Sequence, residues 1–305
     1  MTEYTADAQL TGISLAYTNP EYIADKIFKR VPVSTESFKY KKYDKSLNLQ
    51  LPDSSVGETS IPNEVKFKHC KVTASVRSDA LIDYISQTAV EEAGAESENL
   101  FTTSTEFLTD VFYACREKRL ADLLQDANNY NGNAKTLATA EKFTATGVNA
   151  FNVIDEAMDK VWFKPNVMVG SRGAINALRR NPYVVKAANR NSGDAGKATL
   201  ADLKDLFELQ DIFVGNSVVN TSKRGQTDNF VNTWGNAIML LYIAPQATIT
   251  HGLTFGFTAE KGKRAVTKAF DSERGVRGVH CIKVAEQKAD VIIAPECGYL
   301  ISNVY

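Results

Sequence analysis

The sequence is poor in the residues that most often build catalytic and metal sites. Its 305 residues include three histidines and four cysteines. No histidine stands in a metal-ligand spacing such as H-E-x-x-H. The cysteines lie far apart without a C-x-x-C spacing: Cys70, Cys115, Cys281 and Cys297. Neither a disulfide framework nor a metal site is therefore predicted, and reduced, buried thiols are expected.

An excess of charge of one sign is also missing, as are long apolar runs. The formal net charge is −1, without the basic excess of a dedicated DNA-binding domain. A nearly neutral chain can pack against copies of itself without strong mutual repulsion. No apolar run approaches the roughly 20 residues that span a bilayer, and the opening MTEYTADAQL lacks the features of a signal peptide. We therefore expect no membrane partner, and synthesis in the cytoplasm.

Signatures of enzymes and of bound cofactors are absent. The segment GDAGKAT resembles a phosphate-binding loop, but Asn191 and Ala198 stand where that motif needs glycine and serine or threonine. His280 and Cys281 are neighbours on a predicted strand, where adjacent side chains point to opposite faces. No catalytic residue, cofactor or metal is predicted. An α/β enzyme with an unrecognised site remains as a remote alternative.

Residues 36–78 have the pattern of a long β-hairpin. Apolar and polar residues alternate over 38–51 and again over 65–76, and the turn-rich segment PDSSVGETSIPN separates the two runs. Each arm would reach roughly 40 Å at about 3.3 Å per residue. Because an isolated two-stranded ribbon is marginally stable in water, another molecule is expected to underlie it.

The hairpin is basic and the segment that follows it is acidic. The candidate contacts are Lys39, Lys41, Lys42, Lys45, Lys66 and Lys68 on the hairpin, and Glu91, Glu92, Glu96 and Glu98 after it. One interpretation is two solvated charged faces. The other is that the hairpin of one subunit crosses the acidic stretch of its neighbour. Exposed pairs contribute only about 0–1 kcal/mol each, so they would set register more than strength.

The clearest helix is predicted over residues 100–127. Thr103 and Glu106 match a capping box at its start. The helical spacing predicts a buried face made by Leu108, Val111, Phe112 and Cys115, and an outer face that carries Arg116, Lys118 and Arg119. At 1.5 Å per residue this helix would be roughly 40 Å long, enough to act as the spine of an elongated domain.

The remainder divides into an arm, a compact domain and a returning set of strands. Residues 1–35 form an arm with one short helix over 21–30. Residues 146–245 alternate helices and strands, with helix caps at Ser171 and Thr199 and an apolar central strand over 237–243. Strands are predicted over 253–257, 280–284, 291–294 and 299–304, separated by a basic loop. We expect them to complete the sheet of the long-helix domain, giving an α+β fold.

With this order of elements, the chain resembles the major capsid proteins of tailed bacteriophages, which share the Hong Kong 97-type fold. Four segments carry the resemblance: PNVMVGSRGAINALRRNP at 165–182, LADLKDLFELQDIFVGNSVVNTSKRGQT at 200–227, WGNAIMLLYIAP at 234–245 and DVIIAPECGYLISNVY at 290–305. The resemblance implies five parts: an N-terminal arm (1–35), an extended E-loop hairpin (36–78), a peripheral (P) domain with the spine helix (79–145), an axial (A) domain (146–245) and a return to the P-domain sheet (246–305).

The implied function is self-assembly rather than catalysis. Such subunits form hexamers and pentamers of an icosahedral shell around double-stranded DNA, which they contact non-specifically, and the E-loop lies across a neighbour. The implied location is the virion capsid, assembled in the host bacterial cytoplasm. Expected partners are other copies, a portal protein, a possible decoration protein and a separate scaffolding protein, because no long charged precursor helix precedes the arm. The alternatives are an encapsulin-like nanocompartment shell and, less favoured, a tail or baseplate component.

Overall fold

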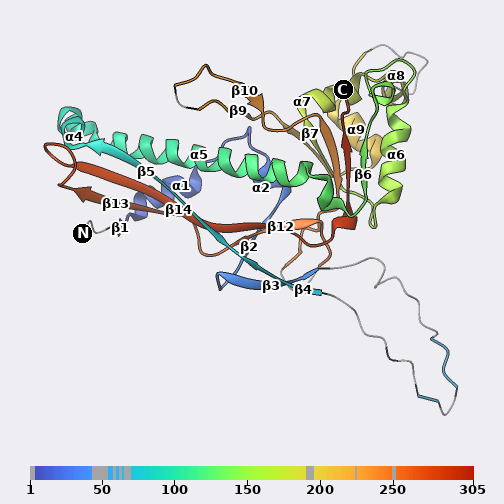
Figure 1. Ribbon diagram of the computed structural model, residues 1–305, viewed down its shortest axis with the longest axis horizontal. Coiled ribbons are helices and arrows are strands. Elements are labelled where there is room, and N and C mark those ends of the chain that lie inside the picture. Colours follow the sequence, from blue (N-terminus) through green and yellow to red (C-terminus); the bar gives the residue numbers. More distant parts are fainter. Residues whose placement is uncertain are drawn as a thin grey trace.

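The chain has an α+β fold in which one long helix lies along an elongated sheet and a smaller α/β unit sits at one end (Figure 1). The computed structural model describes residues 4–42, 54–57, 60–61, 64, 70–189, 196–223, 225–248 and 252–305. The predicted α+β class is confirmed.

The elongated part is built on a six-stranded sheet whose longest strand is β14. Its strands are β1 (Thr5–Ala6), β2 (Arg30–Pro32), β5 (Arg77–Ser86), β12 (Gly256–Glu260), β13 (Ala265–Asp271) and β14 (Val279–Ile292). β14 pairs antiparallel with β13, β12 and β5, and Val284 has Val266 opposite it in β13 and Leu81 opposite it in β5. The core of this sheet is therefore assembled from segments about 200 residues apart.

The sequence did not predict all strands of this sheet. No strand was predicted over β5, and β13 lies within the predicted basic loop. A single strand, β14, spans the two runs expected at 280–284 and 291–294. Charged residues interrupt the apolar pattern in these strands, and in β14 two of them, Glu286 and Lys288, are buried and pair with each other.

The spine helix, α5 (Ser97–Gln125), follows α4 (Gln87–Ala93) and a 3-10 turn (Gly94–Glu96). Gly94, at φ 54°, takes the left-handed conformation that separates the two helices. α5 therefore begins six residues before Thr103, and the predicted capping box is wrong, because Thr103 lies inside the helix. Leu108 and Phe112 are buried against Val266, Ile282 and Val284 of the sheet.

The two faces of α5 differ from the prediction. Val111 is half-buried, Cys115 is exposed, and Arg116, expected on the outer face, is fully buried. The buried row continues from Phe112 in steps of four through Arg116 to Leu120, because these positions share one side of a helix. The sheet covers that row, so a side chain there is buried because of its position on the helix, even when it is charged, as Arg116 is. Cys70 is also exposed, which corrects the expectation that all four thiols are buried.

The N-terminal arm packs on α5 of its own chain and does not need the surface of another molecule. Its first helix, α1 (Ala8–Ala16), was not predicted; the Asp7 carboxylate caps it by accepting from the Leu10 N–H at 3.0 Å. α1 contacts α5, where Ser14 Oγ and Thr109 Oγ1 are 2.8 Å apart. The predicted helix over 21–30 is only α2 (Ala24–Ile27), because Phe28 turns extended and leads into β2.

The base of the predicted hairpin is confirmed. β3 (Ser37–Lys42) pairs antiparallel with β4 (Cys70–Ser75), placing Tyr40 opposite Val72. Phe38 anchors this base because its side chain is buried in the core. Most of the arms and tip, with Lys45, Lys66 and Lys68, lie outside the described residues, as do the first three residues (193–195) of the segment that resembles a phosphate-binding loop.

The α/β unit contains a five-stranded sheet in the order β6, β15, β11, β7, β8. The strands are β6 (Ala134–Thr136), β7 (Val167–Ser171), β8 (Asp211–Gly215), β11 (Ala237–Leu241) and β15 (Gly298–Ser302), and the helices are α6 (Ala150–Lys160), α7 (Arg172–Arg180), α8 (Pro182–Asn189) and α9 (Leu200–Phe207). A further hairpin, β9 (Val218–Asn220) with β10 (Phe230–Asn232), projects from this unit. Short 3-10 turns cover Ala127–Tyr130, Thr139–Glu141 and Pro295–Cys297.

Most elements of this unit match their predictions. The Ser171 hydroxyl accepts from the Ala174 N–H, and Thr199 forms a capping box with Asp202. α8 was missed because Pro182, read as a helix end, opens a new helix. The final strand was assigned to the wrong sheet: β15 pairs with β11, bringing the chain end back to this unit.

Candidate assembly surfaces

The described basic contact residues and the acidic contact residues are well separated along the elongated subunit. β3 carries Lys39, Lys41 and Lys42 near the α/β unit, whereas α4 and the start of α5 lie at the far end (Figure 1). The acidic side chains there are all exposed: Glu91, Glu92, Glu96 and Glu98. The described part of the chain has no ion pair between the two groups, and Glu91 instead pairs with Arg277. The structure does not bring these sets together within one chain.

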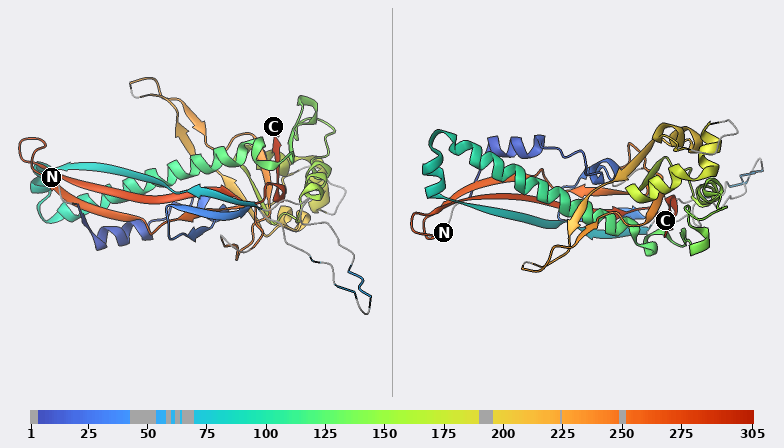
Figure 2. Two further views of the ribbon diagram at one scale, coloured as in Figure 1. Left: turned by 60° about the horizontal axis from the view of Figure 1, so that its bottom comes forward. Right: turned by 90° about the horizontal axis from the view of Figure 1, so that it is seen from above.

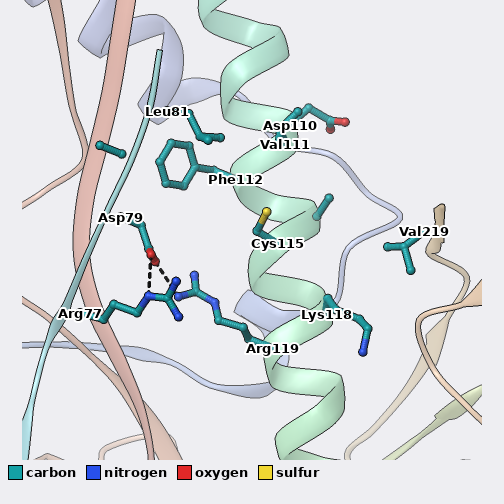
Figure 3. A pocket seen from close by; sticks show the side chains of 12 residues that line it. Arg77, Asp79, Leu81, Asp110, Val111, Phe112, Cys115, Lys118, Arg119 and Val219 are labelled. Atoms are coloured by element: carbon teal, nitrogen blue, oxygen red, sulfur yellow. Dashed lines mark hydrogen bonds and ion pairs between the residues drawn. The ribbon is translucent and has the colours of Figure 1, made fainter. Parts of the chain in front are cut away.

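A groove of about 600 Å³ runs between α5 and β5 (Figure 3). Its apolar side chains include Val111, Ala114 and Cys115 from the helix and Leu81 from the strand. Val219 of the β9–β10 hairpin also lines it. Two of the residues that the helical spacing placed in the core of the subunit, Val111 and Cys115, thus line an open groove.

The charged side chains of this groove are largely neutralised within the chain. Asp79 accepts from Arg77 Nε at 2.9 Å and from an Arg119 guanidinium nitrogen at 2.6 Å. Lys118 pairs with Asp122 one turn further along the helix. The groove therefore offers apolar side chains next to internally paired charges.

The β9–β10 hairpin exposes apolar side chains on both of its faces. Phe230 and Val218 are 68% and 53% exposed and share one face of the ribbon, while Val231 is 45% exposed and lies opposite Val219 on the other. The ribbon stands away from the body of the subunit in every view (Figure 2). Such a ribbon has little stability of its own unless a further surface covers it.

Inside the subunit, Glu117 joins three parts of the chain. One carboxylate oxygen accepts from the backbone N–H groups of Ile23 and Ala24 at 3.0 and 2.8 Å, at the start of α2. The other accepts from the indole N–H of Trp234 at 2.6 Å. Burial raises the pKa of Glu117 above its ordinary value, although all three hydrogen bonds oppose that shift. Glu117 thus fastens the N-terminal arm and the segment before β11 to the spine helix.

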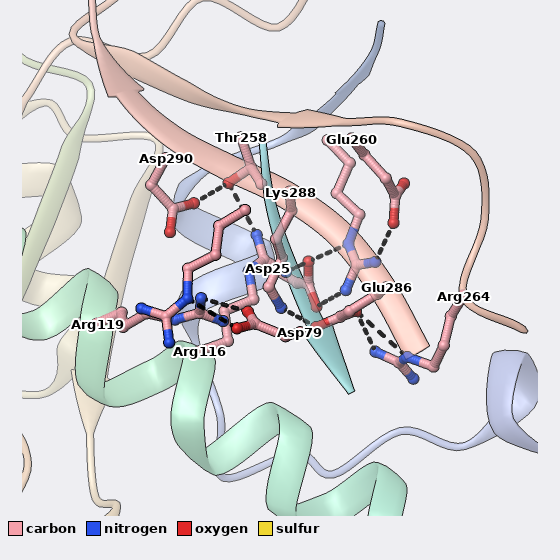
Figure 4. Close-up of polar contacts among 12 residues, drawn as sticks. Asp25, Asp79, Arg116, Arg119, Thr258, Glu260, Arg264, Glu286, Lys288 and Asp290 are labelled. Carbon is pink, nitrogen blue, oxygen red and sulfur yellow. Dashed lines mark hydrogen bonds and ion pairs between the residues drawn. The ribbon is translucent and has the colours of Figure 1, made fainter. Parts of the chain in front are cut away.

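A second group of buried charges lies between α5 and the sheet (Figure 4). Arg116 pairs with Asp25 of the arm and donates to Thr258 Oγ1 at 3.1 Å. Glu286 lies between Lys288 and Arg264, and Arg264 also donates to the Ser14 carbonyl at 3.2 Å. These contacts tie the arm to the sheet.

The charge states within this group are set by burial and by the neighbouring charges. Burial lowers the pKa of Lys288 to about 8, against the opposing pull of Glu286. For Glu286, burial alone would raise the pKa, but Lys288 and Arg264 together lower it. Nothing in the sequence marked Arg116, Glu117, Glu286 or Lys288. Their roles depend on strands that pair far along the chain.

The remaining candidate chemistry has structural explanations. His280 Nε2 lies 2.8 Å from Gln87 Oε1, and its ring packs against Phe101 and Phe270. Cys281 beside it is buried. Among the described residues, no group of three or more potential ligands could hold a metal ion, and none of the helices is long and apolar enough to cross a bilayer.

Comparison with known proteins decides the family. The chain is 33% identical to the major capsid protein of Pseudomonas phage JBD67 over 98% of its own length and 97% of that protein. The chain therefore belongs to the phage major capsid protein family. No protein-family model matches it.

Solved structures show that this capsid protein has the Hong Kong 97-type fold. A phage-related protein from Bordetella bronchiseptica RB50 superposes with a TM-score of 0.76 at 19% identity, over 99% of this chain and 98% of that one. The capsid of cyanophage P-SCSP1u gives a TM-score of 0.60 at 10% identity, over 94% and 89% of the two chains. The capsid protein is a structural protein and not an enzyme, and copies of it assemble into a shell.

Proposed function

We propose that this capsid protein forms hexamers and pentamers of an icosahedral shell that encloses double-stranded DNA in the virion. Assembly takes place in the host bacterial cytoplasm. The observation that carries the proposal is that the basic hairpin base, near the α/β unit, and the acidic helix start, at the far end of the sheet, are well separated in one elongated subunit. Complementary patches that cannot meet within a chain suit a head-to-tail contact, and contacts of that kind form closed rings when the rotation between neighbours closes.

In this arrangement the hairpin of each subunit lies across the acidic end of its neighbour. Lys39, Lys41 and Lys42 lead into the hairpin, and Lys45, Lys66 and Lys68 continue the same charge in sequence. They would face Glu91, Glu92, Glu96 and Glu98 of the adjacent subunit. Because each exposed pair contributes only about 0–1 kcal/mol, the charges select the partner and the register.

The proposed partners beyond other copies follow from the family. They are a separate scaffolding protein, a portal protein and, in a decorated shell, a decoration protein. The packaged DNA would be contacted without sequence preference, consistent with a net charge of −1 rather than a basic surface. No membrane and no cofactor take part in the proposal.

The test is charge reversal with rescue. Lys39→Glu together with Lys41→Glu should leave the purified subunit folded but sharply reduce the yield of particles in negative-stain images. Glu92→Lys with Glu96→Lys should do the same, and the four changes combined should restore particles. Failure of the combined variant to recover while each pair alone is defective would show that these charges do not face each other.

Two further measurements separate the alternatives. Nucleic acid inside native shells is expected for a phage capsid, whereas shells that enclose a protein cargo and no DNA would favour the nanocompartment. Deleting residues 53–61 should leave the subunit soluble and lower particle yield. Normal particle yield in that variant would show that the hairpin tip makes no lattice contact.

A further inference from the structure

The strand β5 has one edge that no described strand of the chain occupies. Residues Val279–Ala285 of β14 pair with β13 on one side and with β5 on the other, so β14 covers a single edge of β5. β5 is ten residues long and borders the molecule along one side (Figure 2). An open strand edge presents backbone N–H and C=O groups to any chain that can pair with them. This edge of β5 therefore either pairs with another strand or must be protected from unwanted strand pairing.

The spine helix presents a second apolar row beside this edge. Phe107, Val111, Ala114 and Cys115 follow the spacing i, i+4, i+7 and i+8, which places them on one side of the helix. This row is distinct from the row that packs on the sheet. Phe107 is 63% exposed and Cys115 is exposed, although such a row is typical of a buried contact.

The two features meet in the groove between α5 and β5. Val111, Ala114 and Cys115 of this row form one wall, β5 forms the other, and Val219 of the projecting hairpin lines the groove from across the helix (Figure 3). Each cation that lines the groove has a carboxylate partner, since Arg77 and Arg119 pair with Asp79, and Lys118 pairs with Asp122. A nucleic acid or phosphate would need unpaired cations here. An extended protein segment with apolar side chains fits the groove, because it can bind both the open edge and the apolar wall.

We propose that a second copy of this chain fills this groove, with an extended segment hydrogen-bonded to the open edge of β5. The proposal rests on the self-assembly described above. It adds a second contact between subunits, made by apolar side chains and main-chain hydrogen bonds, to the contact between the basic hairpin and the acidic helix start. The β9–β10 hairpin takes part, because Val219 lines the groove and Val231 shares its face of the ribbon, while Phe230 and Val218 need cover on the other face. The charged contact sets the register, and the groove supplies most of the buried apolar surface.

Cys115 provides a natural probe of this surface. In a Cys70→Ser background, Cys115 is the one exposed thiol of the native four. Alkylation by iodoacetamide, followed by mass spectrometry, should be rapid in free subunits and slower by roughly tenfold or more in assembled shells. Hydrogen exchange of the peptide spanning Arg77–Ser86 should slow in the same shells. Denatured shells give the total thiol, and Cys281 and Cys297 should react in neither native state.

A matched pair of variants tests the same surface. Cys115→Ser should assemble normally, whereas Cys115→Glu should fold, because the side chain is exposed in the subunit, yet fail to form shells. Equal alkylation of Cys115 in subunits and shells, unchanged exchange in β5, or normal assembly of Cys115→Glu would each overturn the groove contact while leaving a shell-forming protein. Absence of shells from the unmodified chain under all conditions would overturn the proposed function and this contact with it.

Discussion

Replacing Glu117 tests whether the arm, the spine helix and the α/β unit are fastened at one carboxylate. Glu117→Leu removes the acceptor of three buried donors, the backbone N–H groups of Ile23 and Ala24 and the indole N–H of Trp234. Each buried donor left unsatisfied costs about 1–3 kcal/mol. Removing the buried charge offsets part of this loss. We therefore expect the free energy of unfolding to fall by about 3–5 kcal/mol, a large share of the roughly 5–15 kcal/mol typical of a domain.

The graded variant Glu117→Gln sharpens the expectation. Its amide keeps one acceptor oxygen, so either Trp234 or the pair of backbone donors loses its partner. The cost should lie near 1–3 kcal/mol, between the wild type and Glu117→Leu. Glu106→Gln is the matched control, since Glu106 lies exposed on the same helix and should change stability by less than about 0.5 kcal/mol.

The assay is urea unfolding of free subunits, followed by circular dichroism and by tryptophan fluorescence. If Trp234 loses its hydrogen bond, its fluorescence should respond in Glu117→Gln before global unfolding begins. A stability of Glu117→Leu within about 1 kcal/mol of the wild type would refute the reasoning, because it would mean that the three donors find other partners at little cost.

Three other expectations follow from the structure. Lys288 has a pKa of about 8 in the folded chain against 10.5 in the unfolded one. Between these pH values the unfolded chain binds more protons than the folded chain, so the stability of the wild type relative to Lys288→Met should rise as the pH increases from 8 to 10.5. The expected rise is up to about 3 kcal/mol, measured by urea unfolding at each pH. Gly215→Ala should lower the thermal unfolding midpoint by an amount equivalent to about 1–3 kcal/mol, because the added Cβ would lie 2.1 Å from Trp234 Cδ1. An unchanged midpoint would show that the indole moves freely. Leu108→Asp should abolish folding, as judged by circular dichroism, because it buries an unpaired carboxylate at several kcal/mol; normal stability would contradict the packing of α5 on the sheet.

The sequence predicted best where the signals are local. The helix caps at Ser171 and Thr199 act on amides three residues away, and both lie where the spacing placed them. The strand at 237–243 is marked by its continuous apolar composition, and α5 by its helical spacing. These elements were found because their causes lie within a few residues of each other.

The two apolar rows of α5 show the limit of such signals. Periodicity alone could not tell which row faces the sheet, so it joined Val111 and Cys115 to Leu108 and Phe112 as one core face. Once β14 and β13 are in place, they cover the row that contains Leu108, Phe112 and Arg116 and leave the other open. Burial of Arg116 then requires Asp25 from the arm, which no local pattern connects to it.

The sequence by itself determined the order of the main parts of the chain, the helix caps at Ser171 and Thr199, the base of the hairpin and the absence of recognisable catalytic motifs. Only the tertiary structure decided that β5 pairs with β14 and that β15 returns to the α/β sheet. It also decided that Glu117 of the spine helix holds the N-terminal arm and the segment before β11. Strand pairing joins residues up to 263 positions apart, as between Thr5 of β1 and Lys268 of β13, and its register depends on all of the surfaces buried together. A pattern read within a window of a few residues carries no information about such partners.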